Sequence, residues 1–334
     1  MPVRDCVAKL RRTFPTRWHV RGDYRLYDER RRNLSAYYVV WSKSDDVLGE
    51  DWDRRPVDRA GVLLTMAGAW QPLDILRFGL QCHADWVRSG DPADRQRFLA
   101  QADWAAAAQT EFRGIPGVYA IPQGWKRYAC EPGFRSAMAQ GLAISLLLRA
   151  YQATGTPAYL ERAVSASSSY FYEIRDGGVT WRGADGGVVF EGAAALPPSH
   201  ILHGWIYAIW GLFELCLLVD DARTKTLCAE SLATLRTYLP HYDGEAWSYY
   251  SLLAAPNGFR PYATLEYHAF HIAQLHVLAS MTGDDYFAST ALRWQAQLDS
   301  RRSRRRVLAN ALAALAIAST TRGDTVPGGA RSVV

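Results

Sequence analysis

Four turn signals recur along the chain at nearly constant spacing, and this repeat constrains the fold more than any other feature. They begin at Ser89, Thr154, Asp220 and Thr282, at intervals of 65, 66 and 62 residues. Each is preceded and followed by an apolar pattern of helical period, and glycine or aspartate stands between the two patterns. A repeat of two helices per unit predicts stacked helical hairpins.

Such hairpins can form an open solenoid or curl around an axis into a toroid with a central cleft. The segment Ser199–Leu218 is apolar nearly all round, which favours a covered inner ring of helices over an exposed solenoid face. Residues 179–181 and 188–190 flank a glycine-rich turn and predict a β-hairpin. We therefore expect a mainly α protein, an (α/α) toroid of helical hairpins with a small β-hairpin at the cleft.

The two ends of the chain differ from this middle part. We expect residues 1–60 to be an irregular or β-containing lead-in with a candidate strand at 37–41, and residues 61–300 to form the toroid. Residues 301–334 are an Arg-rich tail, expected to be partly disordered, in which the apolar run 307–318 could dock as a helix. Seven arginines and one aspartate give this tail a charge of +6 against +5 for the whole chain, so the rest carries −1.

Composition narrows the classes of function. The chain has 334 residues, 49% hydrophobic and 21% charged, an ordinary balance for a soluble globular protein. Because the basic charge is confined to the tail, which is either a solvated segment or an anion-binding one, we expect no specific nucleic-acid partner. We expect no membrane span or signal peptide, and five scattered cysteines suit a reducing, cytoplasmic setting. Twelve Trp and 18 Tyr suit carbohydrate binding or a large helical core.

One segment is too particular to be helix filler. Residues 131–141 read EPGFRSAMAQG, in which a Pro-Gly turn leads to Ser136, a good N-cap for the helix that follows. The small residues after it allow another backbone or a ligand to approach closely, and Gln140 is the amide near the helix start. This segment resembles the SAMAQG segment of the D-glucuronyl C5-epimerases, enzymes that invert uronic acid residues in heparan-type polysaccharides.

Three further segments resemble the same family, in the same order. They are residues 197–212 (PPSHILHGWIYAIWGL), 247–252 (WSYYSL) and 266–275 (EYHAFHIAQL). The last is similar to the Y-H-x-x-H-I-x-Q-L signature of the epimerases. The resemblance covers about 170 residues, from Glu131 to Trp294, and four ordered segments are together far more specific than any one of them.

The resemblance implies an isomerase that needs no cofactor and acts on an acidic polysaccharide. Inversion at C5 of a uronic acid removes a proton next to a carboxylate and returns it on the other face, so acid/base groups must reach both faces. Tyr250 and Tyr267 fall on the family's catalytic tyrosines, although Ser251 replaces the aspartate of the family's Y-D-L motif. His203 falls where the family has asparagine. A homodimer is also implied.

The chain departs from the family at the end of the β-hairpin. There the epimerases carry E-E-Y-P, but an ungapped match from Pro197 gives Gly192 and Ala193 at the second glutamate and the tyrosine. Only Glu191 remains, and a slip of one residue would bring it to the catalytic position. We therefore take Glu191 and His203 as candidate partners of the two tyrosines.

Candidate substrate-binding residues follow from the same segments. Gln140 and Arg135 are expected to bind substrate, with Arg135 pairing with the carboxylate, and the further candidates are Ser136, His268 and Arg260. His268 and His271 share a helix face, but no third ligand has fitting spacing, so we expect no metal site. Core packing is the competing interpretation for Tyr267 and His271.

Two other functions remain open. A polysaccharide lyase shares the first step, abstraction of the C5 proton, and then eliminates the substituent at C4. A non-catalytic glycan-binding relative would explain the loss of side chains at Gly192 and Ala193.

Overall fold

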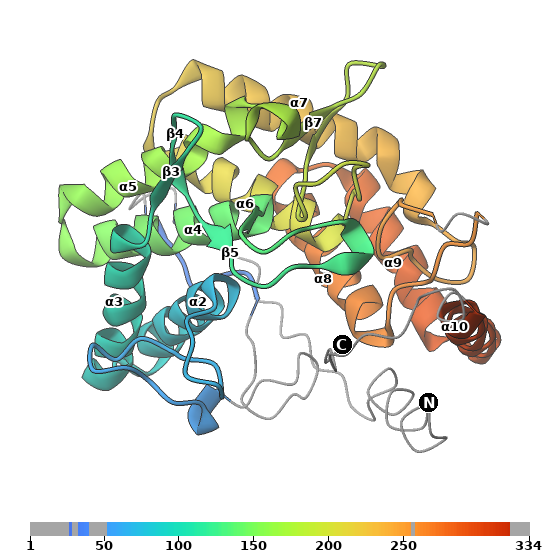
Figure 1. Cartoon of the computed structure of the whole chain (residues 1–334), viewed down its shortest axis with the longest axis horizontal. Coiled ribbons are helices and arrows are strands. Elements are labelled where there is room, and N and C mark those ends of the chain that lie inside the picture. The colour runs from blue at the N-terminus through green and yellow to red at the C-terminus, as the bar shows by residue number, and fades with distance from the viewer. Residues whose placement is uncertain (1–26, 29–32, 40–51, 255–257, 321–334) are drawn as a thin grey trace.

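The computed structural model describes residues 27–28, 33–39, 52–254 and 258–320 (Figure 1). Helices dominate it and pair into hairpins. The first helices of the pairs are α2 (Pro72–Ser89), α4 (Ala137–Thr154), α6 (Leu202–Leu218) and α8 (Leu265–Thr282). Their partners are α3 (Pro92–Ala107), α5 (Pro157–Ser167), α7 (Ala222–Tyr238) and α9 (Asp285–Asp299). The first helices pack on one another in chain order and form the inner layer, which confirms the predicted (α/α) toroid.

The predicted turn signals separate the helices of each pair. Gly90, Gly155 and Gly283 end α2, α4 and α8 in the left-handed conformation, with φ of 73°, 71° and 67°. Glycine adopts this conformation without steric cost, so it suits the residue that follows a helix. Side chains of Asp91 and Asp284 then cap the next helix. Helix α6 instead ends at Val219 in an extended conformation, and Asp221 caps α7.

Helices α4 and α6 cross at two glycines. A Cβ on Gly211 would lie 2.5 Å from Cα of Gly141, and one on Gly141 would lie 2.4 Å from the carbonyl oxygen of Tyr207. The small residues of the SAMAQG segment therefore serve a close approach of two backbones. Beside this crossing, fully buried Arg149 and Glu214 form a two-pronged ion pair at 2.7 and 2.9 Å.

Short antiparallel strand pairs lie in the segments outside the helices. They are β1 (Tyr27–Asp28) with β2 (Asn33–Leu34), β3 (Thr110–Phe112) with β4 (Ile115–Val118), β5 (Ala120–Ile121) with β6 (Phe134–Arg135), and β7 (Thr180–Arg182) with β8 (Val188–Phe190). The last pair, in register Trp181 to Val189, is the predicted hairpin. The strand expected at 37–41 is not formed in its described part, because 37–39 are irregular and two buried tyrosines pack there against Trp210 of α6.

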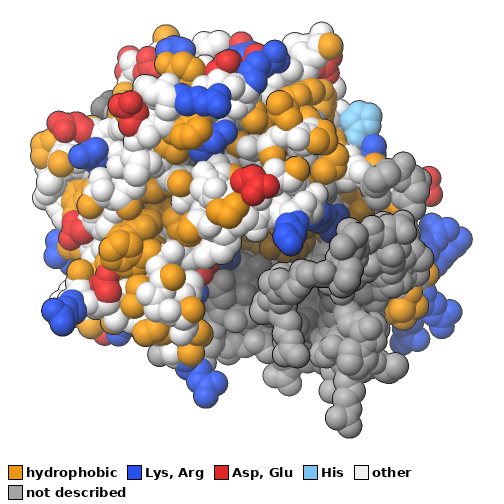
Figure 2. Space-filling view, viewed as in Figure 1, with side chains coloured by type: hydrophobic (Ala, Val, Ile, Leu, Met, Phe, Trp, Pro, Cys, Tyr) orange, Lys and Arg blue, Asp and Glu red, His pale blue; other side chains and the backbone are white. Residues whose placement is uncertain are grey.

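The Arg-rich segment begins as a helix, α10 (Arg301–Thr320), which packs on α9. Its arginines are exposed, whereas Val307 is buried and the Asn310 side chain accepts a hydrogen bond from the backbone of Tyr262. Figure 2 shows basic side chains gathered at this edge, and charges of both signs mixed over the rest of the visible face. Residues 321–334 lie outside the described part, as do most of the predicted 1–60 lead-in. Among the described helices, none has the length and apolarity that a bilayer crossing requires.

Candidate active site

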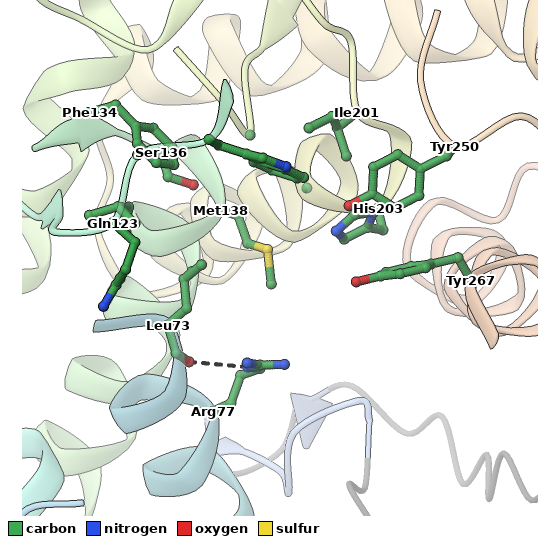
Figure 3. A pocket seen from close by; sticks show the side chains of 15 residues that line it. Leu73, Arg77, Gln123, Phe134, Ser136, Met138, Ile201, His203, Tyr250 and Tyr267 are labelled. Carbon is green, nitrogen blue, oxygen red and sulfur yellow. Dashed lines mark hydrogen bonds between the residues drawn. The ribbon is translucent and has the colours of Figure 1, made fainter. Parts of the chain in front are cut away.

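A pocket opens among the starts of α4, α6 and α8, the first two turns of α2 and the loop after β5 (Figure 3). It encloses about 240 Å³, close to the lower end of the range of about 300–1,000 Å³ that is usual for small-molecule sites. We call it the tyrosine pocket. Its lining residues are Leu73, Arg77, Ile121, Gln123, Gly124, Trp125, Phe134, Ser136, Met138, Gly192, Ile201, His203, Gly204, Tyr250 and Tyr267.

Both tyrosines predicted to be catalytic lie on one wall of this pocket. The rings of Tyr250 and Tyr267 meet edge to face with centroids 4.7 Å apart, and each lies beside the ring of His203, at 5.0 and 4.7 Å. In Figure 3 the three side chains stand together, and Gln123, Phe134 and Ser136 face them across the pocket. The pocket thus brings together three of the four predicted catalytic residues.

Local structure explains how they meet. The backbone of Tyr250 accepts a hydrogen bond from the N–H of Leu202 at 3.2 Å, which ties the segment around Tyr250 to the start of α6. Tyr267 lies in the first turn of α8, where its N–H is capped by the hydroxyl of Thr264. Residues distant in sequence therefore converge through two helix starts.

The electrostatics of this wall favour uncharged side chains. Burial lowers the pKa of His203 to about 3, with a smaller contribution from the positive charge of Arg77, so the imidazole is neutral at ordinary pH. Burial, the neighbouring phenol of Tyr267 and a hydrogen bond to it raise the pKa of Tyr250 well above its usual value of 10. Tyr250 is consequently a neutral phenol that holds its proton.

Among the lining residues that sequence reasoning missed, Arg77 and Trp125 have the side chains best suited to contact a sugar acid. Arg77 of α2 contributes its positive charge; its guanidinium pairs with Asp74 at 2.7 Å and its side chain is 12% exposed. Trp125 adds a half-buried aromatic surface beside Tyr128. The signal for Arg77 was an arginine within the segment 72–80, which is apolar except for Arg77 and Asp74, whereas nothing in the sequence distinguished Trp125 from other tryptophans.

Glu191 does not line the tyrosine pocket. Its fully buried carboxylate accepts hydrogen bonds from the N–H and hydroxyl of Ser199 and from the N–H of His200, and it also contacts the His200 ring. The backbone oxygen of Glu191 accepts from the first residue of α4, Ala137. Glu191 therefore stabilises the loop before α6, because its carboxylate is bound by Ser199 and His200 of this loop and not by the tyrosines.

The two residues that replace the family's glutamate and tyrosine have different surroundings. Gly192 lines the pocket, and a Cβ there would meet Cα of Gly204 at 3.4 Å and Cβ of Ile201 at 3.7 Å, which are ordinary contacts. Ala193 is completely buried. The wall next to the start of α6 thus has room for a side chain at Gly192.

Gln140 and Arg135 also lie outside the pocket wall. The Gln140 amide is buried and bonds to the backbone of Tyr119, Gly117 and Ala166, so it joins loops instead of facing a ligand. The guanidinium of Arg135 lies 4.2 Å over the ring of Phe112.

Of the three remaining binding candidates, one lines the pocket and two do not. Ser136 lines the pocket and caps α4 through its hydroxyl, as predicted. His268 is fully buried between Ser248 and the carbonyl of Trp294, and its ring stacks on Trp247 at 3.9 Å, so it belongs to the core. Arg260 does not line the pocket, and its backbone accepts a hydrogen bond from Asn310. The described residues contain no group of three metal-ligating side chains.

Comparison with known proteins gives the family. The family model described as D-glucuronyl C5-epimerase C-terminus matches residues 113–296, more than half of the chain. The chain belongs to this family. It is 31% identical over 213 residues to the D-glucuronyl C5-epimerase of Caenorhabditis elegans, which covers 59% of this chain and 34% of the relative. It is also 28% identical over 179 residues to an uncharacterised protein of Methanocaldococcus jannaschii, which covers 50% of this chain and 54% of that protein.

The chain therefore spans about a third and about half of the lengths of these two relatives. Solved structures of unsaturated glucuronyl hydrolases are more distant. The one from Bacillus sp. GL1 is 18% identical with a TM-score of 0.45, covering 67% of this chain and 61% of its own. That from Streptococcus agalactiae is 19% identical with a TM-score of 0.43, covering 67% and 56%.

Proposed function

We propose that the tyrosine pocket binds a uronic acid residue of an acidic polysaccharide and epimerises it at C5 by proton removal and return. The observation that carries this proposal is the contact of Tyr250, Tyr267 and His203 on one wall, in a chain of the C5-epimerase family. A volume of about 240 Å³ suits one sugar unit, with the rest of the glycan outside.

The charges support a division of roles. Arg77 is the cation of the pocket and can pair with the uronate carboxylate, which stabilises negative charge developing at C5. Tyr250 keeps its proton, so it is the donor of the pair. Its hydroxyl can also donate to a phenolate of Tyr267, which makes Tyr267 the base that removes the C5 proton. Trp125 offers an aromatic face to the sugar.

One observation favours a second candidate, polysaccharide lyase activity. Both phenols lie on the same wall, and the residues opposite them, Gln123, Phe134 and Ser136, include neither acid nor base. Elimination needs proton removal from one face only, whereas inversion needs a proton delivered to the other face. A solvent molecule on the side of Ser136 would supply that proton in an epimerase.

Incubation of a heparosan-type polysaccharide with the protein in D₂O distinguishes these outcomes. Deuterium at C5 with new iduronate, followed by NMR, is expected for the epimerase. The ultraviolet absorbance of an unsaturated uronate would mark a lyase, and glycan binding without either product would mark a non-catalytic relative.

Tyr267→Phe is expected to lower the rate of C5 exchange by about 100-fold or more, as for loss of a general base. Tyr249→Phe is the matched control, because Tyr249 stacks on Tyr262 and does not line the pocket. Equal rates for the two variants would refute the assignment of Tyr267.

A further inference from the structure

Two arginines of the described chain lie against the same aromatic ring. The guanidinium carbon of Arg135, at the end of β6, lies 4.2 Å from the ring centroid of Phe112 on β3, and that of Arg113 lies 5.4 Å from it. Arg135 is half-buried and Arg113 is exposed. Each cation–π contact is favourable by itself, but two like charges at one ring repel each other. An anion beside the ring would relieve this repulsion.

The protein supplies no such anion within its described part. No carboxylate there forms an ion pair with either arginine, and Glu173 in the neighbouring segment is paired with Arg175 at 2.8 Å. Burial and the charge of Arg113 lower the pKa of Arg135, and the neighbour that raises it is the Cys130 thiol. Burial raises the pKa of this thiol to about 11, so it is uncharged at ordinary pH. Arg135 therefore has no counter-charge.

Most hydrogen-bond donors of the two guanidinium groups are also unused. Arg113 donates from one Nη to the backbone oxygen of Arg175 at 3.0 Å. Nε of Arg135 is buried without a partner, whereas its two Nη atoms are open to solvent and form no hydrogen bond with the residues that the structure describes. A guanidinium group presents its N–H donors in a planar fork that matches two oxygens of a carboxylate or sulfate. The chemistry of the pair is thus that of an oxyanion site.

Strand β6 places this pair next to the tyrosine pocket. Phe134 and Ser136 line the pocket, and Arg135 stands between them in the chain. Successive side chains of an extended segment point to opposite sides, so Arg135 points away from the pocket and toward β3. The arginine pair and the pocket therefore lie on the two sides of a single strand.

We propose that Arg113 and Arg135 together bind an acidic group, a carboxylate or a sulfate, on a second sugar unit of the polysaccharide. The source of this group rests on the proposed function, in which Arg77 pairs with the uronate that reacts at C5. The arginine pair touches neither that carbon nor its proton. Both arginines consequently determine the affinity for longer chains and not the rate of the chemical step. A free inorganic oxyanion is the other source of the same chemistry.

Binding to the full chain tests the site without any turnover. The probes are a heparosan hexasaccharide, a heparosan disaccharide and inorganic sulfate, and calorimetry measures each Kd. We expect Arg135→Gln and Arg113→Asn each to weaken binding of the hexasaccharide about tenfold, as for loss of a charge-assisted hydrogen bond, and to leave that of the disaccharide within about twofold. Asparagine suits position 113, where φ is 52°, because it tolerates the left-handed region. Since Arg113 is exposed, this variant tests the site independently of any loss of stability at Arg135.

Arg95→Gln is the matched control. Arg95 is also half-buried and lies 5.5 Å over the ring of Trp86, in the last turn of α2, whereas the pocket is at the first two turns. This variant should bind all three probes as the wild type does. Equal hexasaccharide affinity in the wild type and both test variants would overturn the proposal. So would arginine-dependent binding of sulfate without any effect on the hexasaccharide, which would indicate a site for a free oxyanion.

Kinetics separate this inference from the proposed function. We expect Arg135→Gln to raise KM for the polymer about tenfold with kcat for C5 exchange within about twofold, because the reacting unit lies in the tyrosine pocket. A lower kcat at unchanged KM would contradict a role in affinity. If the wild type shows no C5 exchange but its hexasaccharide affinity depends on both arginines, the proposed function fails and the oxyanion site stands.

Discussion

At the scale of single residues, the tyrosine pocket combines two phenols, a neutral imidazole and one arginine. Tyr250 and Tyr267 touch each other and His203, so a change in the protonation of one is felt by the others. The carboxylate of Glu191, which was predicted to join them, instead accepts hydrogen bonds from Ser199 and His200 in the loop before α6. The pocket therefore lacks a lining carboxyl group among its described residues, and Gly192 marks a place for one.

Gly192→Glu is expected to raise the rate of C5 inversion about tenfold relative to the wild type. The added carboxyl would stand in the wall beside Gly204, where a Cβ meets only ordinary contacts. This gain is smaller than the roughly 10²–10⁴-fold typical of a positioned general acid or base, because the new side chain is not held by evolved neighbours. The measurement is the NMR ratio of iduronate to glucuronate with time.

Gly192→Gln is the control for that variant, since it has nearly the same size and no titratable proton. An equal increase in both variants would show that packing, not acid/base chemistry, produced the effect.

At the scale of secondary-structure elements, the α4–α6 crossing organises the inner layer. Two glycines bring the helix backbones together, and the ion pair of Arg149 with Glu214 joins the same helices in the core. These contacts with α4 hold helix α6, which begins at the pocket, in place. Both features are placed to transmit packing changes to His203 in the first turn of α6.

Gly211→Ala is expected to destabilise the protein by about 1–3 kcal/mol, the usual cost of overpacking a core. Its Cβ would lie 2.5 Å from Cα of Gly141, and neither backbone can yield without shifting a helix. Chemical denaturation measures the effect, with Gly192→Ala as the matched control whose Cβ has room. A Gly211→Ala protein as stable as that control would contradict the observed crossing.

Glu214→Gln is expected to cost about 3–5 kcal/mol, because it leaves the Arg149 guanidinium buried without its counter-charge. Urea denaturation is the measurement. The double variant Arg149→Met with Glu214→Leu removes both charges and should lose clearly less than the single one. A double variant less stable than Glu214→Gln would contradict this explanation, because the loss would then not come from the buried guanidinium left without its counter-charge.

At the scale of the whole molecule, four histidines that are buried in the described part of the chain make the free energy of unfolding depend on pH. Burial lowers the pKa of His83, His203 and His268 to about 3, and that of His271 well below its usual value. In the unfolded chain the histidine pKa is near 6.5, so below this pH the unfolded chain binds protons that the folded protein does not bind. The free energy of unfolding therefore falls as the pH drops from about 6.5 toward 3.

The expected loss is about 2 kcal/mol per histidine at pH 5, taken from the difference between pH 5 and an unfolded pKa of about 6.5. Summed over the group this is a large part of a typical stability of about 5–15 kcal/mol, so we expect acid unfolding near pH 5. Urea midpoints at pH 7.5, 6 and 5 measure it, and His83→Phe should have a shallower dependence. A midpoint unchanged over this range would contradict the burial of the histidines.

The repeat of turn signals predicted the helical hairpins, because each signal depends only on residues close to it in the chain. Gly90, Gly155 and Gly283 adopt a backbone conformation that few other residues tolerate, and Asp91 and Asp284 cap the helices beside them, so each signal acts within a few residues. Family resemblance located Tyr250, Tyr267 and His203, which meet in the pocket.

Tertiary structure alone decided which side chains face that pocket. Gln140 and His268 lie within the family's motifs, yet their polar atoms are bound by backbone groups and core side chains brought from elsewhere in the chain. Arg77 belongs to no such motif and faces the tyrosines because α2 packs beside α4. The sequence by itself determined where the paired helices are separated, since the turn residues act locally. The use of each polar side chain depended on contacts across the fold, which spacing along the chain does not encode.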